Sequence, residues 1–305
     1  MSKQPLPAWI RRRVTISEEY LSLCRLLTET RLHTVCQSAS CPNIYECFHQ
    51  RQITFMILGN ICTRNCRFCG VTKGKPLDVD PEEAGKISLA VSSLKLSQVV
   101  ITSVTRDDLP NGGAIFFQEV TQAIKKASPK VKVELLIPDF QGKIESLEFV
   151  FKGSPDIIGH NLETVPSLYP EVRPLANYQC SLEVLRQSKQ AGFLTKSSLM
   201  LGLGETKVEV LKVFEQLHQA GCDFLVVGQY LQPDPSCLPV KEYLPPEKFA
   251  EYREQARQIG FKYVSSGPFF RSSYRTSELW ATLSDQRPAK RMEEAALRPS
   301  PNGPE

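Results

Sequence analysis

The sequence is poor in several patterns that mark common enzyme classes. It contains only four histidines among 305 residues, and no Ser/His/Asp order stands out, so hydrolytic chemistry is poorly supplied. It has no glycine-rich loop ending in Gly-Lys-Ser/Thr, and Gly202-x-Gly204 lacks the third glycine of a dinucleotide fingerprint. These absences argue against hydrolytic, P-loop and dinucleotide-binding enzymes.

Long apolar runs and an excess of one charge are also missing. No apolar run approaches the roughly 20 residues that span a bilayer, and the opening residues lack the apolar core of a secretory signal. The 37 basic and 33 acidic residues give a formal net charge of +4, which is too balanced to indicate nucleic acid. We therefore expect a cytoplasmic protein that binds neither membrane nor nucleic acid and keeps its thiols reduced.

Cysteine, by contrast, is concentrated in one stretch of the chain. Six of the ten cysteines form two triads within 34 residues: Cys36, Cys41 and Cys47, then Cys62, Cys66 and Cys69. Thiolates are the ligands that soft metals and iron–sulfur clusters take. Each triad is one ligand short of a set of four, which leaves a coordination position open for chemistry.

The cysteines have two other interpretations. Disulfides would require an oxidising compartment. Structural zinc is the stronger alternative, because His33 and His49 could each complete a tetrahedral set. However, the spacing Cys-x-x-x-Cys-x-x-Cys is unusual for zinc and suits three corners of a cubane cluster. The remaining cysteines, Cys24, Cys180, Cys222 and Cys237, are scattered and are expected to be small buried residues.

Beyond residue 52 the pattern alternates between strands and helices. Residues 53–59 are almost continuously apolar, as in a parallel strand buried on both faces, and the second triad follows within three residues. Five further strands are predicted near 98–104, 131–137, 156–158, 195–201 and 223–228. Helix starts are predicted at residues 80–83 and at a capping box from Thr206 to Glu209. Six such units predict an α/β fold, a partial (β/α)6 TIM-like barrel with its active site at the strands' carboxyl ends.

Two segments flank the predicted barrel. Residues 1–50 are expected to form an N-terminal extension with one amphipathic helix and the first triad. The barrel and an Arg-Ser-Ser-Tyr segment occupy residues 51–284. Residues 285–305 carry four prolines and eight charges with almost no apolar stripe, which predicts a disordered tail.

Several motifs carry a resemblance to known families. The second triad, with the aromatic Phe68 before its third cysteine, resembles the signature of the radical S-adenosylmethionine (SAM) superfamily. The sequence context of the first triad, residues 38–47, is similar to the auxiliary-cluster motif of the lipoyl synthase family. Further motifs of that family occur in order at residues 106–114, 159–165, 200–206, 228–233, 267–268 and 271–274. The resemblance implies a partial barrel of radical SAM type.

The resemblance also implies two [4Fe–4S] clusters with different roles. Cys62, Cys66 and Cys69 would hold a cluster whose remaining iron binds SAM, and one electron would release a 5′-deoxyadenosyl radical. Cys36, Cys41, Cys47 and Ser273 would hold an auxiliary cluster that is consumed as the sulfur donor. The implied enzyme inserts two sulfur atoms, at C6 and C8 of a protein-bound octanoyl group. An unactivated C–H bond has no acidic proton for a base to remove, so this reaction requires a radical.

We expect no catalytic residue beyond the cluster ligands, and four contacts to SAM. Phe68 should lie near the adenine, Asn161 and Glu163 near the ribose or amino group, and Arg173 near the carboxylate. The implied partners are octanoylated lipoyl carrier domains or H protein, an electron donor such as ferredoxin or flavodoxin, and an iron–sulfur cluster carrier.

Ser198, Cys237 and Arg275 depart from the family pattern, although none of them is a predicted cluster ligand. Two alternative functions stand beside the main one. Another radical SAM sulfur-insertion enzyme, such as one like biotin synthase, would not carry the first triad. A non-catalytic iron–sulfur or zinc module that senses redox state would need neither a barrel nor Ser273.

Overall fold

The computed structural model describes residues 6–12 and 14–285. The chain divides into two compact units, Met1–Tyr274 and Arg275–Glu305. The second unit has one described helix, α11 (Thr276–Asp285). The predicted disordered tail lies outside the described residues except for Asp285, where α11 ends. The predicted division after residue 50 falls inside the first unit, which also contains every predicted site residue.

Seven parallel strands form the main sheet of the first unit, in the order β1-β4-β5-β6-β7-β8-β9. Their bounds are β1 Thr54–Ile57, β4 Gln98–Ser103, β5 Lys132–Leu136, β6 Ile157–Gly159, β7 Leu194–Leu201, β8 Phe224–Gln229 and β9 Tyr263–Gly267. A second, two-stranded sheet pairs β2 (Ile61–Cys62) with β3 (Thr72–Lys73). The six predicted strands and the partial barrel are confirmed, and β9 adds a seventh strand.

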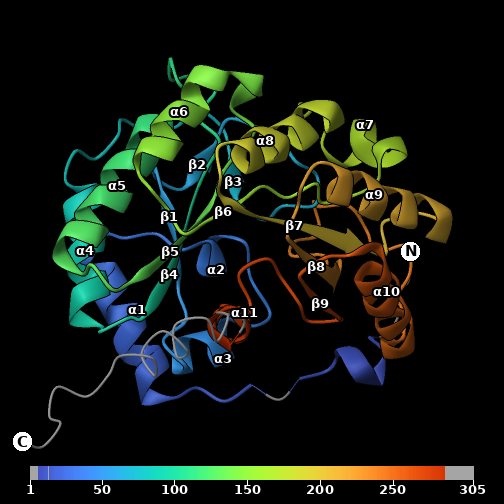
Figure 1. The fold of residues 1–305 in the computed structure, drawn as a ribbon. Helices are drawn as coiled ribbons and strands as arrows, with labels where there is room; N and C mark the ends of the chain where they lie inside the picture. The colour runs from blue at the N-terminus through green and yellow to red at the C-terminus, as the bar shows by residue number, and fades with distance from the viewer. Residues whose placement is uncertain (1–5, 13, 286–305) are drawn as a thin grey trace, which may run out of the picture. The chain divides into compact units, whose positions relative to one another are not determined.

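Helices cover the sheet on its outer side. Figure 1 shows α4, α5, α6, α8, α9 and α10 along that side, whereas α2 lies on the inner side. The α-helices of the first unit are α1 Glu18–Thr30, α2 Val35–Ser38, α3 Ile44–His49, α4 Glu83–Ser93, α5 Ala114–Ala127, α6 Ile144–Lys152, α7 Tyr169–Val172, α8 Tyr178–Gln190, α9 Lys207–Gln219 and α10 Pro246–Ile259. Short 3-10 turns lie at Ala8–Ile10 (η1), Phe140–Gly142 (η2) and Pro166–Leu168 (η3). In the described part of the chain, none of the helices has the length and apolar character needed to cross a membrane.

Helix α9 illustrates how local sequence sets this packing. Thr206 caps the helix by accepting a hydrogen bond from the Glu209 amide, and the Glu209 side chain accepts one from the Thr206 amide. The predicted capping box is therefore confirmed. The apolar stripe that follows (Val210, Val213, Phe214 and Leu217) is fully buried. Burial of such a stripe against the sheet is the main source of stability for a helix of this length.

Helix α4 begins two residues later than the Asp80-Pro81-Glu82-Glu83 pattern predicts, at Glu83 instead of Pro81. The Asp80 carboxylate accepts a hydrogen bond from the Glu82 amide (2.9 Å) and closes a turn before the helix. Glu83 points inward instead and accepts a hydrogen bond from the Leu58 amide (2.8 Å), and burial raises its pKa. Leu58 has a left-handed backbone (φ 69°) directly after β1. Glu83 therefore fixes the exit of β1, where the loop to the second triad begins.

An ion pair is buried inside the barrel. Lys196 on β7 donates to the Glu134 carboxylate on β5 (2.6 Å), and the two side chains are only 3% and 1% exposed. The strand β6 lies between β5 and β7, so the pair spans an intervening strand. The second carboxylate oxygen of Glu134 has no hydrogen-bond partner among the described residues. The charges of Lys196 and Glu134 therefore compensate each other in the buried interior.

Lys196→Met should lower the free energy of unfolding by about 3–5 kcal/mol, because it leaves the Glu134 carboxylate buried without a counter-charge. Equilibrium urea unfolding of the purified chain measures this change. The double variant Lys196→Met/Glu134→Leu should recover most of the loss, since it removes both charges. A single variant within about 1 kcal/mol of the parent would contradict this account.

Candidate functional site

A cavity of about 470 Å³ lies at the carboxyl ends of the strands. Its wall includes residues that end or follow β4, β5, β6 and β8, such as Ser103, Asp139, His160 and Tyr230. All predicted site residues line it: Cys36, Cys41, Cys47, Cys62, Phe68, Cys66, Cys69, Asn161, Glu163, Arg173 and Ser273. The fold thus brings together residues from both ends of the chain at the edge of the sheet where barrel active sites lie.

The second triad begins at the end of β2 with Cys62, and Cys66 and Cys69 lie in the loop between β2 and β3. The Cys62 sulfur accepts hydrogen bonds from the backbone amides of Arg64 (3.5 Å) and Thr105 (3.3 Å). Burial raises the pKa of the Cys66 thiol and raises the pKa of Cys69 to about 12. A bound metal reverses this effect, because a coordinating thiol loses its proton. Amide groups aimed at sulfur then stabilise the thiolate charge.

Arg64 anchors the second-triad loop to the barrel. Its guanidinium is buried (5% exposed) and donates to Asp107 (2.7 and 3.0 Å) and to Asp139 (2.7 and 2.6 Å). Burial alone would raise the pKa of Asp139, but the hydrogen bonds and charge of Arg64 lower it to about 2. The sequence alone does not reveal that Arg64 anchors this loop. Arg64 lies inside the triad and Asp107 inside the 106–114 motif, but nothing in the sequence indicates their pairing.

The first triad is placed by two short helices on the inner side of the sheet. Cys36 lies in α2, Cys47 lies in α3, and Cys41 lies in the turn between them. The Thr34 side chain caps α2 by accepting from the Gln37 amide (3.3 Å), and the Cys41 amide donates to the Cys36 carbonyl (3.0 Å). Burial and the nearby Cys41 thiol raise the pKa of Cys36 to about 12. The Thr34 cap and the bond from Cys41 to Cys36 therefore help to position these thiols.

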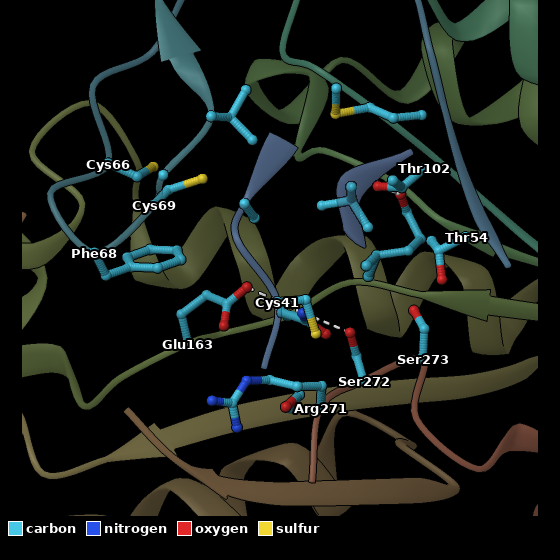
Figure 2. Close-up of a pocket in the computed structure, with 18 of the residues that line it drawn as sticks. Cys41, Thr54, Cys66, Phe68, Cys69, Thr102, Glu163, Arg271, Ser272 and Ser273 are labelled. Carbon is cyan, nitrogen blue, oxygen red and sulfur yellow. Dashed lines mark hydrogen bonds between the residues drawn. The ribbon is translucent and has the colours of Figure 1, made fainter. Parts of the chain in front are cut away.

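The C-terminal segment closes the same side of the cavity. The Tyr274 amide donates to the Arg271 carbonyl (2.9 Å) and forms a turn that presents Ser272 and Ser273. The Ser272 hydroxyl accepts a hydrogen bond from the Asn161 side chain (3.3 Å). Figure 2 shows Cys41, Ser272 and Ser273 on one side of the cavity, and Cys66, Phe68 and Cys69 on the other. The two triads therefore face each other across one space.

Polar side chains from the chain that follows β6 line the same cavity. The Asn161 amide group donates to the Glu163 carboxylate (3.0 Å), and burial raises the pKa of Glu163. Arg173 donates from Nη1 to the carbonyls of Asn161 (3.0 Å) and Leu162 (3.2 Å). The Arg173 Nε atom is buried and has no hydrogen-bond partner among the described residues. An unpaired guanidinium donor at a cavity wall fits an anionic group such as a carboxylate.

His160 adds a second unpaired polar atom to the cavity wall. Nδ1 of its ring lies 2.8 Å from the Ile137 carbonyl oxygen. Burial lowers its pKa to about 4, so the ring is neutral near pH 7. Nδ1 then donates to the carbonyl, and the buried Nε2, which has no partner in the described part of the chain, is an acceptor. These orphaned polar atoms fit a ligand as rich in polar groups as SAM.

The donor set also distinguishes iron–sulfur clusters from zinc. Neither His33 nor His49 lines the cavity, and His49 instead contacts Ser17 and Glu19 (3.2 Å each). Within residues 6–12 and 14–285, no three His, Cys, Asp or Glu side chains converge on a single-ion site. A cubane offers each thiolate its own iron, so its ligands surround a volume and need not meet at a point. Six cysteines and a serine around one cavity fit that arrangement.

Two of the three departures from the family pattern touch this site. Ser198 lines the cavity, and the Cys237 thiol donates to the backbone carbonyl of Cys69 (3.4 Å). Arg275 lies in the second unit, where it pairs with Glu278 (3.3 Å). Among the scattered cysteines, Cys222 and Cys237 are buried as predicted, whereas Cys24 and Cys180 are only partly buried.

Comparisons with known proteins agree with this geometry. Residues 56–217 match the radical SAM superfamily. The chain is 51% identical over 280 residues to lipoyl synthase from Caldicellulosiruptor saccharolyticus, covering 91% of this chain and 98% of that one. It is 52% identical over 274 residues to lipoyl synthase from Geotalea uraniireducens, covering 89% and 96%.

Solved structures are alike in fold. Methylornithine synthase aligns with a TM-score of 0.52 at 14% identity, covering 93% of this chain and 94% of that one. At such low identity the likeness concerns the fold alone. The curated relatives match almost the whole chain at about half identity, and the superfamily match spans the core of the barrel. The chain therefore belongs to the lipoyl synthase family of radical SAM enzymes, whose cofactors are SAM and [4Fe–4S] clusters.

Proposed function

We propose that this chain inserts two sulfur atoms, at C6 and C8 of an octanoyl group carried by a lipoyl carrier protein. The proposal rests on one observation, the meeting of both cysteine triads and Ser273 on a single cavity. Cys62, Cys66 and Cys69 would hold the SAM-binding cluster, and Cys36, Cys41, Cys47 and Ser273 the auxiliary cluster. When bound, SAM and the first cluster supply a radical that attacks an unactivated C–H bond, and the second cluster supplies sulfur.

The chain's own residues orient SAM and exclude water in this proposal. Arg173 offers its unpaired Nε to the SAM carboxylate, while Asn161 and Glu163 form a hydrogen-bonded pair for its ribose or amino group. Phe68 offers an aromatic face for the adenine. Apolar side chains of Met56, Val104, Leu136 and Met200 line the same cavity and suit an alkyl chain. A dry wall around the reacting carbons protects a radical from side reactions.

Ser273 is the ligand that distinguishes the auxiliary site. A serine oxygen is a harder donor than a thiolate and fits iron in a cluster less well. The bond from Ser273 would therefore yield first when the auxiliary cluster is opened for its sulfur. The neighbouring Ser272 is already engaged by Asn161, which supports Ser273 as the ligand.

The proposal extends to domains and partners. Residues 1–50 would carry the auxiliary thiols, and residues 51–284 the barrel with the Arg-Ser-Ser-Tyr segment. An enzyme that spends a cluster needs a cluster carrier to replace it, and reductive cleavage of SAM needs an electron donor such as ferredoxin or flavodoxin. The first triad favours this function over a reaction like that of biotin synthase.

Cys62→Ala and Cys36→Ala should separate the two sites. Each variant should bind about four irons per chain instead of about eight, because each loses one cluster. Cys62→Ala should abolish SAM cleavage, whereas Cys36→Ala should cleave SAM but add no sulfur to an octanoylated lipoyl-domain peptide. Iron analysis, 5′-deoxyadenosine release and mass spectrometry of the peptide measure these outcomes.

Cys24→Ala is the matched control, because Cys24 is a partly buried thiol that does not line the cavity. This variant should bind about eight irons per chain, cleave SAM and insert sulfur as the parent does. Sulfur insertion by Cys36→Ala would refute the assignment of the auxiliary site.

Gly228 allows the C-terminal segment to reach the cavity. The segment crosses β8 so closely that a Cβ atom at Gly228 would lie 2.0 Å from the Phe270 carbonyl oxygen and 3.0 Å from Arg271 Nη1. The Phe270 oxygen belongs to the backbone, so a side-chain rotation cannot relieve the clash. Any larger residue at Gly228 must therefore displace the segment that carries Ser273.

Gly228→Ala should weaken the auxiliary site while sparing the SAM site. We expect binding of about four irons and SAM cleavage without sulfur insertion, because Ser273 moves away from the first triad. Gly85→Ala is the matched control, since a Cβ at Gly85 meets nothing within 4 Å. Full iron content and normal sulfur insertion in Gly228→Ala would show that this close approach does not position Ser273.

A further inference from the structure

The N-terminal strap, defined as residues 6–12, crosses the barrel between two distant segments. The Trp9 indole donates to the Leu244 carbonyl (3.2 Å) just before α10, and Ile10 is buried. Two residues later the strap reaches the first triad and the C-terminal segment through Arg12. The strap is thus anchored at one end, and Arg12 makes its contacts at the other.

Arg12 contacts both segments that supply the auxiliary site. Its Nη1 donates to Glu46 (2.8 Å) in α3 and to Asn43 (3.2 Å), the residue that directly precedes that helix. Its Nη2 donates to the Tyr274 hydroxyl (3.3 Å), and the guanidinium carbon lies 3.8 Å from the centre of the Phe269 ring. A planar guanidinium suits this combination of fork-like hydrogen bonds and stacking, which a lysine cannot reproduce.

The two segments also form direct hydrogen bonds with each other, through residues that Arg12 contacts. The Asn43 side chain donates to the Phe269 carbonyl (2.7 Å), and the Tyr274 hydroxyl donates to Glu46 (2.8 Å). We define the Arg12 clamp as Arg12, Asn43, Glu46, Phe269 and Tyr274. In the sequence, Glu46 directly precedes Cys47, and Tyr274 directly follows Ser273. The clamp therefore joins the immediate neighbours of two predicted ligands that lie far apart in the chain.

We propose that Arg12 is a positioning residue that sets the placement of Ser273 relative to the first triad. The inference rests on the proposed function, because it takes Cys36, Cys41, Cys47 and Ser273 as one ligand set. Arg12 does not line the cavity, and its guanidinium contacts Asn43, Glu46, Phe269 and Tyr274. Its positive charge also compensates the Glu46 carboxylate, which otherwise stands beside the thiols of the first triad. Without Arg12, the two segments lose the link that runs through its guanidinium and keep the direct bonds from Asn43 to Phe269 and from Tyr274 to Glu46.

Hydrogen–deuterium exchange tests the clamp directly, in both cluster-free and reconstituted full-length chain. In Arg12→Gln, amide protection in residues 43–47 and 269–274 should fall about three- to tenfold, the effect of losing one partly exposed charged hydrogen-bond network. Arg12→Lys should recover part of the protection, because it keeps the charge beside Glu46. Arg11→Gln is the matched control, since Arg11 donates only to Leu6 within the strap among the described contacts.

A chelator experiment on reconstituted protein supplies the second readout. Arg12→Gln should release about four of its eight irons faster than the parent, keep SAM cleavage, and give an auxiliary-cluster Mössbauer spectrum shifted toward that of Ser273→Ala. Unchanged protection and iron release would overturn the role of Arg12. An equal loss of protection in the sheet strands would also overturn it, because the effect would then be global.

The two proposals fail in distinguishable ways. If the parent chain binds only about four irons, the proposed function fails whatever Arg12 does. If the parent binds about eight and Arg12→Gln behaves like Arg11→Gln, the function stands and the clamp is wrong.

Discussion

Parallel strands bring all their carboxyl ends to one edge of a sheet, and this constraint determines where the chain can assemble a site. The loop after β1 carries the second triad to that edge, and the loops after β4 and β5 bring Asp107 and Asp139 to meet it. The first triad precedes β1 and lies outside the strand–helix alternation, whereas Ser273 follows the last parallel strand, β9. The short helices α2 and α3 position the first triad, and the turn at residues 271–274 presents Ser273 beyond the carboxyl end of β9.

Buried ion pairs fix the positions of side chains and loops, both inside the barrel and at its mouth. Within the barrel, Lys196 and Glu134 pair across β6, and at its mouth Arg64 joins the second-triad loop to two strand ends. Such pairs contribute less net stability than their Coulomb attraction suggests, because both partners lose hydration. They do penalise every arrangement that separates the partners. The second-triad loop is thereby held in one geometry by protein groups alone.

Local sequence predicts the strands and most helices well, because these depend on short-range patterns. The burial of residues 53–59 and the capping box at Thr206 are examples. The predicted start of α4 was wrong. The Glu83 carboxylate accepts a hydrogen bond from the Leu58 amide, 25 residues away, instead of one from its own helix. Pairings such as Arg64 with Asp139 join residues 75 positions apart, and no local pattern encodes them. The missed features all depend on such distant partners.

The two sides of the cavity differ in how they are built. One side is anchored within the barrel by Arg64, Asp107 and Asp139. The other side is assembled from the segment before β1 and the segment after β9, which hydrogen-bond to each other. If the auxiliary cluster is spent in each reaction, this asymmetry allows the polypeptide to be used again. The segments before β1 and after β9 can separate to admit a fresh cluster, while the side held by Arg64 keeps its shape. Reloading would then cost a local opening and not the unfolding of the enzyme.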